Sequence, residues 1–97
     1  MNIQNLMAQA QRVQKELERA NNEIENSSFE GNNGAVKVIL SGKNEITSVE
    51  ILDDSVLSDK EMLQDMIMLA VNDGLSKIAK MKQDKLGKYT GGLWGLF

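Results

Sequence analysis

An apolar alternation between residues 35 and 51 constrains the fold most strongly, because it predicts a β-hairpin. The apolar residues at every second position are Val36, Val38, Leu40, Val49 and Ile51. A Gly-Lys-Asn turn at residues 42–44 separates the two runs, and Gly and Asn tolerate the positive φ angles of tight turns. Since alternate side chains of a strand point to one face, the hairpin should place one apolar face on a core.

The other face of this hairpin also carries apolar residues. Ile39 and Ile46 have the opposite parity, whereas the solvent face of an antiparallel sheet is usually polar. We therefore expect a second element to cover that face as well.

A third strand is predicted just before the hairpin. Phe29 and Glu30 suit a short strand, and the Gly-Asn-Asn-Gly run at residues 31–34 suits the turn that follows it. The expected sheet is a three-stranded antiparallel meander.

The N-terminal segment has the strongest periodicity and is predicted to be a long helix. Its apolar residues recur at alternating steps of three and four, at Ile3, Leu6, Ala10, Val13, Leu17, Ala20 and Ile24. A helix over residues 3–24 is roughly 33 Å long at 1.5 Å per residue, whereas a seven-residue strand spans about 23 Å. The helix should overhang the sheet, and its seam then needs a partner. That partner is a second copy in a homodimer, or else the second helix of the same chain.

A second helix is predicted from Ser58 onward, with Ser58 as N-cap and Glu61 as its capping-box partner. Gly74 is expected to allow close packing, and Gly87 to end the helix. A broad apolar stripe is expected in the core, at Met62, Leu63, Met66, Ile67, Ala70, Val71, Leu75, Ile78, Ala79 and Leu86. Residues 88–97 would then be a flexible tail of a single domain, or a segment that docks on a partner or a membrane interface.

The residue inventory argues against an enzyme. The chain has no cysteine and no histidine, which removes thiolate ligands, the usual general base and the commonest metal ligand. No phosphate-binding loop or dinucleotide fingerprint occurs, and the adjacent Asp53 and Asp54 suit the dipole of the helix that follows. We predict no catalytic residue, cofactor or metal. Charged residues within residues 1–25 exclude a signal peptide or membrane span there, which predicts a soluble, cytoplasmic protein.

Basic charge is concentrated towards the C-terminus. Residues 1–73 hold six Lys/Arg and thirteen Asp/Glu, whereas residues 74–97 hold five Lys and one Asp. Lysines near a helix C-terminus suit its dipole, and the remaining patch is either a solubilising surface or a phosphate-binding one.

Two basic stripes are expected, one on each helix, because their members recur at helical spacings. In a dimer they would meet phosphates of duplex DNA and give salt-sensitive, sequence-tolerant binding. The candidate DNA-binding residues are Arg12, Lys15, Arg19, Lys77, Lys80 and Lys85.

Short motifs follow one another in a specific order along nearly the whole chain, at residues 5–11, 29–31, 36–38, 49–51, 61–65, 70–74 and 87–93. In this order they resemble the YbaB/EbfC family of bacterial nucleoid-associated proteins. The resemblance implies an α+β, α-β-β-β-α subunit that pairs into a homodimer with protruding helices and binds double-stranded DNA with little or modest sequence preference. By position, the same six basic residues match the basic surfaces of the family's first and last helices.

The sequence departs from the family pattern in two respects. Its tail has Leu93-Trp94-Gly95-Leu96-Phe97 where relatives place proline, and its net charge of −3 predicts weak or salt-labile DNA binding. The leading hypothesis is a dimeric, cytoplasmic, nucleoid-associated DNA-binding protein with roles in nucleoid organisation and gene regulation. The alternative is a small protein adaptor that uses the tail and a Met-rich helix with Met62, Met66, Met68 and Met81.

Overall fold

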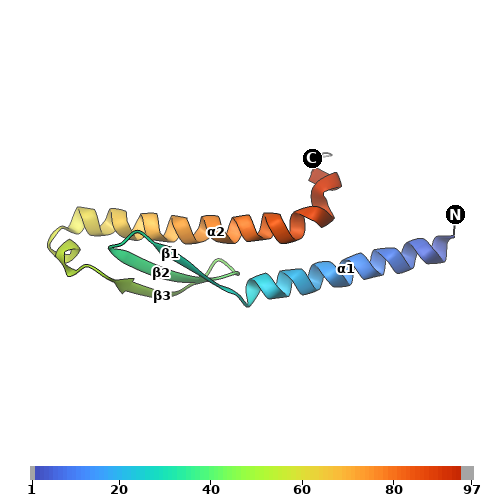
Figure 1. The fold of residues 1–97 in the computed structure, drawn as a ribbon, viewed down its shortest axis with the longest axis horizontal. Coiled ribbons are helices and arrows are strands. Elements are labelled where there is room, and N and C mark those ends of the chain that lie inside the picture. The colour runs from blue at the N-terminus through green and yellow to red at the C-terminus, as the bar shows by residue number, and fades with distance from the viewer. Residues whose placement is uncertain (1, 95–97) are drawn as a thin grey trace.

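The computed structural model describes the backbone of residues 2–94 and the side chains of residues 2–87, and it has the predicted α-β-β-β-α order (Figure 1). The elements are α1 (Ile3–Glu25), β1 (Ser28–Asn32), β2 (Val36–Ser41), β3 (Ile46–Ile51), the 3₁₀ helix η1 (Asp54–Ser58) and α2 (Lys60–Trp94). The predicted α+β class, the three-stranded antiparallel sheet and the two long helices are confirmed.

The sheet has the order β1-β2-β3 and contains one irregularity that changes its faces. Ile39 pairs with Ser48, but Leu40 pairs with Ile46, so Thr47 is an extra residue in β3. Residues directly opposite each other share a face, and Ile46 therefore lies on the same side as Leu40. The expectation that Ile46 and Ile39 share a face is wrong. The outer face is mainly polar, with a Lys37–Glu50 ion pair of 3.2 Å, and no described element covers it.

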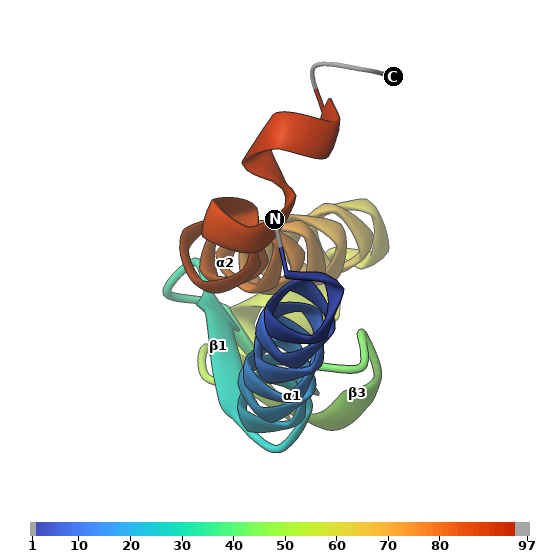
Figure 2. The same ribbon diagram turned by 90° about the vertical axis from the view of Figure 1, so that its right-hand side faces the viewer.

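Helix α2 covers the inner face of the sheet, where it packs on β1 and β2 (Figure 2). The central strand supplies Val36, Val38 and Leu40, which are fully buried because they alternate towards the helix. The core cluster is Ile24, Phe29, Val36, Val38, Leu40, Ala70 and Ile78. Within the predicted α2 stripe, Met62 and Ala79 are exposed instead.

Two glycines bring α2 against the sheet. A Cβ at Gly74 would lie 2.2 Å from Leu40 Cδ1, which confirms the close packing expected there. Gly31 was expected in a turn but lies within β1, where a Cβ would stand 1.8 Å from the Ala70 carbonyl oxygen. The turn itself contains Gly34, with φ +90°, and is held by Asn33, whose Oδ1 accepts from the Val36 N–H at 3.0 Å.

Helix α1 overhangs the sheet, as its length predicts, and its buried and partly buried residues lie in its C-terminal part (Figure 1). Its N-cap is Asn2, whose Oδ1 accepts from the Gln4 N–H at 2.9 Å and so satisfies a free backbone donor. Its anchor is Ile24, which is fully buried, and a Cβ at Gly42 would lie 1.8 Å from the Ile24 carbonyl oxygen. Towards the N-terminus the seam opens to solvent, and Ile3 is 72% exposed.

The two ends of α2 differ from expectation. Asp59, rather than Ser58, caps the helix, because its Oδ1 accepts from the Met62 N–H at 3.1 Å. The Ser58 hydroxyl instead donates to the Ser55 carbonyl at 2.9 Å and closes η1. At the other end the helix passes Gly87 and runs to Trp94. A flexible tail is predicted for residues 88–97. The side chains of residues 88–94 and the whole of residues 95–97 lie outside the described residues, so the flexibility of this tail stays a prediction.

Candidate nucleic-acid interface

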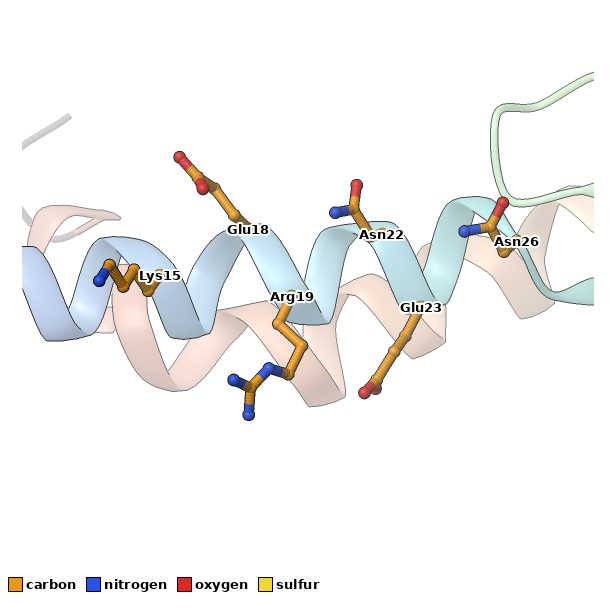
Figure 3. A pocket seen from close by; sticks show the side chains of 6 residues that line it. All are labelled: Lys15, Glu18, Arg19, Asn22, Glu23 and Asn26. Atoms are coloured by element: carbon orange, nitrogen blue, oxygen red, sulfur yellow. The ribbon is translucent and has the colours of Figure 1, made fainter.

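The overhanging part of α1 carries a basic stripe. Arg12, Lys15 and Arg19 are all exposed, and none of them forms an ion pair with another residue whose side chain is described. Their spacing of three and four residues keeps them on one helix flank. Figure 3 shows Lys15 and Arg19 projecting from this part of α1, with α2 behind it.

The surface around the stripe is shallow. An open depression of about 590 Å³ is lined by five residues of α1 and by its C-cap Asn26 (Figure 3); the five are Lys15, Glu18, Arg19, Asn22 and Glu23. A second of about 270 Å³ is lined by Ala8, Gln11, Arg12 and Lys15. Binding sites for small molecules are enclosed and mostly apolar. These open depressions, lined mainly by charged and amide side chains, fit an extended charged ligand better than a small molecule.

Carboxylates moderate the positive charge of α1. Glu16 and Glu18 lie between Arg12 and Arg19 in the sequence, and Glu23 follows one turn later. Opposite charges at this spacing reduce the local potential, and solvent and salt screen it further. Any attraction of this helix for phosphates is therefore modest and strongly dependent on ionic strength.

The three candidate lysines of α2 occupy different environments. Lys80 is exposed and forms no ion pair within the part of the chain with described side chains. The Lys85 ammonium lies 3.2 Å from Glu23 Oε2, so it is brought to α1. The Lys77 ammonium donates to the Glu30 carbonyl at 2.7 Å and lies 3.3 Å from Asp73 Oδ2. It therefore sits at the outer edge of β1, away from the α1 stripe.

Two carboxyl groups have shifted pKa values, and both shifts arise from structural hydrogen bonds. The Asn32 N–H and the Lys77 ammonium lower the pKa of Asp73 below its ordinary value of 3.8. Ser55, through its side chain and its backbone N–H, lowers the pKa of Asp53. Asp53 Oδ1 accepts from the Ser55 N–H at 3.0 Å and caps η1, which agrees with the structural role expected for this carboxylate.

No group of three or more metal-ligating side chains is present among the described residues. Within the same part of the chain, neither helix combines the length and apolar character that crossing a bilayer requires. The arrangement offers a charged surface for contact with another macromolecule.

Sequence spacing identified the exposed α1 stripe, but not the partners of Lys77 and Lys85. The two contacts join residues that are 47 and 62 positions apart in the sequence, so no local sequence pattern predicts them. Spacing alone therefore did not identify Asp73 and Glu23 as their partners. The one available hint was the i,i+4 spacing of Asp73 and Lys77, which is common on helix surfaces.

The fold and the surface define a class of protein, a small α+β protein with a projecting, partly basic helix. The chain belongs to the YbaB/EbfC DNA-binding family, whose model matches residues 1–93. This is a family of DNA-binding, nucleoid-associated proteins with bacterial members, and not a known class of enzymes.

Individual relatives agree with this assignment. The chain is 42% identical to a nucleoid-associated protein of Ruminiclostridium cellulolyticum, over 98% of this chain and 85% of the relative. It is 44% identical to nucleoid-associated protein LL0120 of Lactococcus lactis, over 96% and 97% of the two chains. The crystal structure of the uncharacterized protein HP0035 from Helicobacter pylori superposes with a TM-score of 0.68 at 27% identity, covering 87% of this chain and 91% of that one.

Proposed function

We propose that the chain works as a homodimer that binds double-stranded DNA, mainly through its phosphates, at the nucleoid in the cytoplasm. The observation that carries this proposal is the α1 overhang, which presents Arg12, Lys15 and Arg19 without intramolecular ion pairs among the described side chains. The family and the names of its bacterial relatives support DNA as the partner and the nucleoid as the location. Nucleoid organisation and gene regulation are the cellular roles that would follow.

The dimer is supported by an apolar strip on the inner face of β3. Val49 is 51% exposed and Ile46 is 50% exposed, although they pair with the buried Val38 and Leu40. Three strands are about 14 Å wide at 4.8 Å per strand, whereas a helix is about 10 Å across. One α2 therefore covers two strands and leaves space over β3 for a helix of the second copy.

Exposed apolar residues of α2 also favour an interface. Leu69 and Met62 lie on α2 itself and are 49% and 46% exposed. Large apolar patches on a soluble protein commonly mark an interface. A second copy that supplies its own α2 would cover the strip on both subunits at once, as a two-fold interface requires.

The exposed apolar seam of α1 also supports a homodimer. Leu6 and Val13 remain about half exposed because α2 packs only against the C-terminal part of α1. The alternative that α2 of the same chain covers the whole seam does not fit these exposures. We propose that a second subunit covers the seam and that pairing repeats the basic stripes.

Binding would depend on phosphates, because the exposed cations are not arranged for base recognition. Phosphate contacts position a protein without reading sequence, and each contact steepens the salt dependence by about 0.9 in log–log units. All six candidate residues belong to the proposed surface. The ion pairs of Lys77 and Lys85 predict that these two contribute less than Arg12, Lys15, Arg19 and Lys80.

The test is a titration of a fluorescent DNA duplex with the full chain at low and moderate salt, together with sedimentation of protein and complex. We expect binding that weakens steeply with salt and differs little between duplex sequences. Absence of binding at low salt and about 0.1 mM protein, where even non-specific association is detectable, would contradict the DNA-binding proposal.

A protein adaptor is the second candidate, and the exposure of two methionines favours it. Met62 is 46% and Met68 is 54% exposed, and flexible thioether side chains suit adaptable protein interfaces. A chain with Met62→Lys and Met68→Lys that still dimerises and binds DNA, but loses a captured protein partner, would support the adaptor. Loss of the dimer itself would assign Met62 and Met68 to the subunit interface.

A further inference from the structure

The outer edge of β1 has a defined set of outward-pointing backbone groups. The Asn33 N–H donates to the Val36 carbonyl at 3.3 Å, and the Gly42 N–H donates to the Ser27 carbonyl at 3.2 Å. In an antiparallel ladder alternate residues of a strand bond to the same neighbour. Odd-numbered residues of β1 therefore face β2, and Glu30 and Asn32 direct their backbone groups away from the sheet.

Two side chains of α2 satisfy these outward groups. The Lys77 ammonium donates to the Glu30 carbonyl at 2.7 Å, and the Asn32 N–H donates to Asp73 Oδ2 at 3.2 Å. The ion pair between Lys77 and Asp73, at 3.3 Å, joins the two contacts. The Asp73 carboxylate thus takes the place of the carbonyl, and the Lys77 ammonium the place of the N–H, that a neighbouring strand would offer on either side of Gly31.

The close approach of α2 to β1 makes this arrangement possible. A Cβ at Gly31 would lie 1.8 Å from the Ala70 carbonyl and 2.8 Å from the Gly74 nitrogen, so only glycine allows the helix to lie so near. Asp73 and Lys77 are one turn apart on the same helix face. The hydrogen bond from Asn32 and the nearby Lys77 lower the pKa of Asp73, which keeps its carboxylate charged in the role of acceptor.

We propose that Asp73 and Lys77 form a clasp that holds the outer edge of β1 closed and prevents a strand of a second copy of this chain from pairing with it. An unprotected edge strand is a template for pairing between molecules. At the other edge, the extra residue in β3 interrupts the ladder, and bulges of this kind discourage pairing. The β1 edge has no bulge, and the clasp closes it instead.

A second copy is the occupant that the β1 sequence itself favours. If two β1 strands paired antiparallel about Gly31, Glu30 of one copy would stand opposite Asn32 of the other. That pairing puts an amide, and no like charge, opposite each carboxylate. It uses the outer edge of the sheet and not the inner face, so it would add to the proposed dimer and does not depend on DNA binding.

The decisive variant exchanges the two side chains, as Asp73→Lys with Lys77→Asp. Net charge and an i,i+4 ion pair on α2 are retained, but the donor then faces the Asn32 N–H and the acceptor faces the Glu30 carbonyl. The matched control exchanges another ion pair, as Lys37→Glu with Glu50→Lys, on the outer face of the sheet. Circular dichroism checks that both variants fold.

We expect the Asn32 amide of the clasp variant to exchange with solvent at least about tenfold faster, because local opening costs less there. We also expect sedimentation to show assemblies larger than the wild-type particle that grow with concentration up to about 0.2 mM, a range in which exposed edges associate. The wild type and the Lys37/Glu50 control should keep one size over this range.

Two outcomes would overturn the proposal: unchanged Asn32 exchange in the folded variant, or an opened edge without larger assemblies. If the exchanged variant does not fold, Lys77→Met removes only the donor to Glu30 and must still produce larger assemblies. Duplex titration separates this inference from the proposed function. Because Lys77 also belongs to the proposed DNA surface, weaker DNA binding by a clasp variant says nothing against the clasp, whereas normal assembly of the folded variant contradicts the clasp whatever its DNA affinity.

Discussion

Glu23 on α1 and Lys85 on α2 form an ion pair of 3.2 Å although 62 positions separate them in the chain. Glu23 immediately precedes the buried anchor of α1 at Ile24, and Lys85 lies in the C-terminal half of α2. The ion pair therefore joins the two helices near the end of the sheet, and it pairs a lysine that we propose as a phosphate contact.

Removing the Glu23 charge should strengthen DNA binding. In Glu23→Gln the Lys85 ammonium loses its partner and becomes available, so we expect affinity for duplex DNA at low salt to rise by about three- to tenfold, the scale of one further phosphate contact. Stability should fall by less than about 1 kcal/mol, because the pair is exposed. Glu18→Gln removes the same charge without releasing a lysine and should raise affinity less. If the two variants bind DNA with equal affinity, the release of Lys85 from Glu23 does not contribute to binding.

Neutralising the α1 stripe should abolish most DNA binding. We expect Arg12→Gln, Lys15→Gln and Arg19→Gln together to reduce the salt slope by about 3 and to lower affinity by about 100-fold or more. The control neutralises three other lysines, Lys37, Lys43 and Lys60, and so changes net charge equally. Fluorescence anisotropy over a salt series measures both variants. If the control loses as much affinity as the stripe variant, overall charge and not this surface controls binding.

A charge on the inner face of β3 should separate the dimer. Val49→Lys places an ammonium where we propose that a second subunit packs, and burial of an unpaired charge costs several kcal/mol. Sedimentation equilibrium at about 10 µM, a concentration at which a weakened interface dissociates, should give the monomer mass. Ser48→Lys, on the adjacent position and the opposite face, should retain the dimer. If both variants remain dimeric, the subunit interface does not include the inner face of β3.

Adding one methyl group at each of two glycines should have opposite effects on stability. Gly31→Ala drives a Cβ into the Ala70 carbonyl, which cannot move without shifting α2, so we expect a loss of at least about 2 kcal/mol. Gly87→Ala meets no atom within 4 Å and lies in a helix, so we expect a gain of roughly 0.5–1 kcal/mol. Urea denaturation measures both. A neutral Gly31→Ala would mean that β1 and α2 are not in close contact.

Acid should open the edge of β1. The folded state lowers the pKa of Asp73 below 3.8, so its contribution is present above the unfolded pKa and is lost as pH falls through the folded value. We expect the Asn32 amide to keep its protection at pH 5 and to lose it only below about 3.9, the ordinary aspartate range. NMR titration of the Asp73 carboxyl and Asn32 exchange measure this. In Asp73→Asn the protection should become independent of pH across that range.

Local patterns predicted the elements of this fold well because their causes are local. The alternation of Val36, Val38 and Leu40 specifies a strand whatever packs on it, and the α1 heptad specifies a long helix. The face of Ile46 was not predictable in this way, because the extra residue at Thr47 exists only in the pairing of two strands. Counting alternate residues along the sequence puts Ile46 on the face of Ile39, whereas the extra residue in β3 moves Ile46 to the face of Leu40.

The misplaced helix boundaries have a similar explanation. Ser58 and Asp59 are both good N-cap residues. Asp59 caps α2 because the Ser58 hydroxyl donates its hydrogen bond within η1. Gly31 looked like part of a turn, but the nearness of Ala70 explains its presence in β1. For the candidate site, spacing predicted the common flank of the cations, whereas the partners of Lys77 and Lys85 depend on tertiary contacts.

The buried anchor of α1 lies near its C-terminal end, at Ile24 against Gly42, and would act as the pivot of a projecting lever. Between Ile24 and Ile3 the helix is about 30 Å long. A swing of about 10° at the pivot therefore carries the tip through roughly 5 Å, by the geometry of a rigid rod of that length. Arg19, close to the pivot, moves little, and Arg12 moves farther. In the proposed dimer, small adjustments at the pivot would let two such arms change their span to match the curvature of the duplex that we propose they bind.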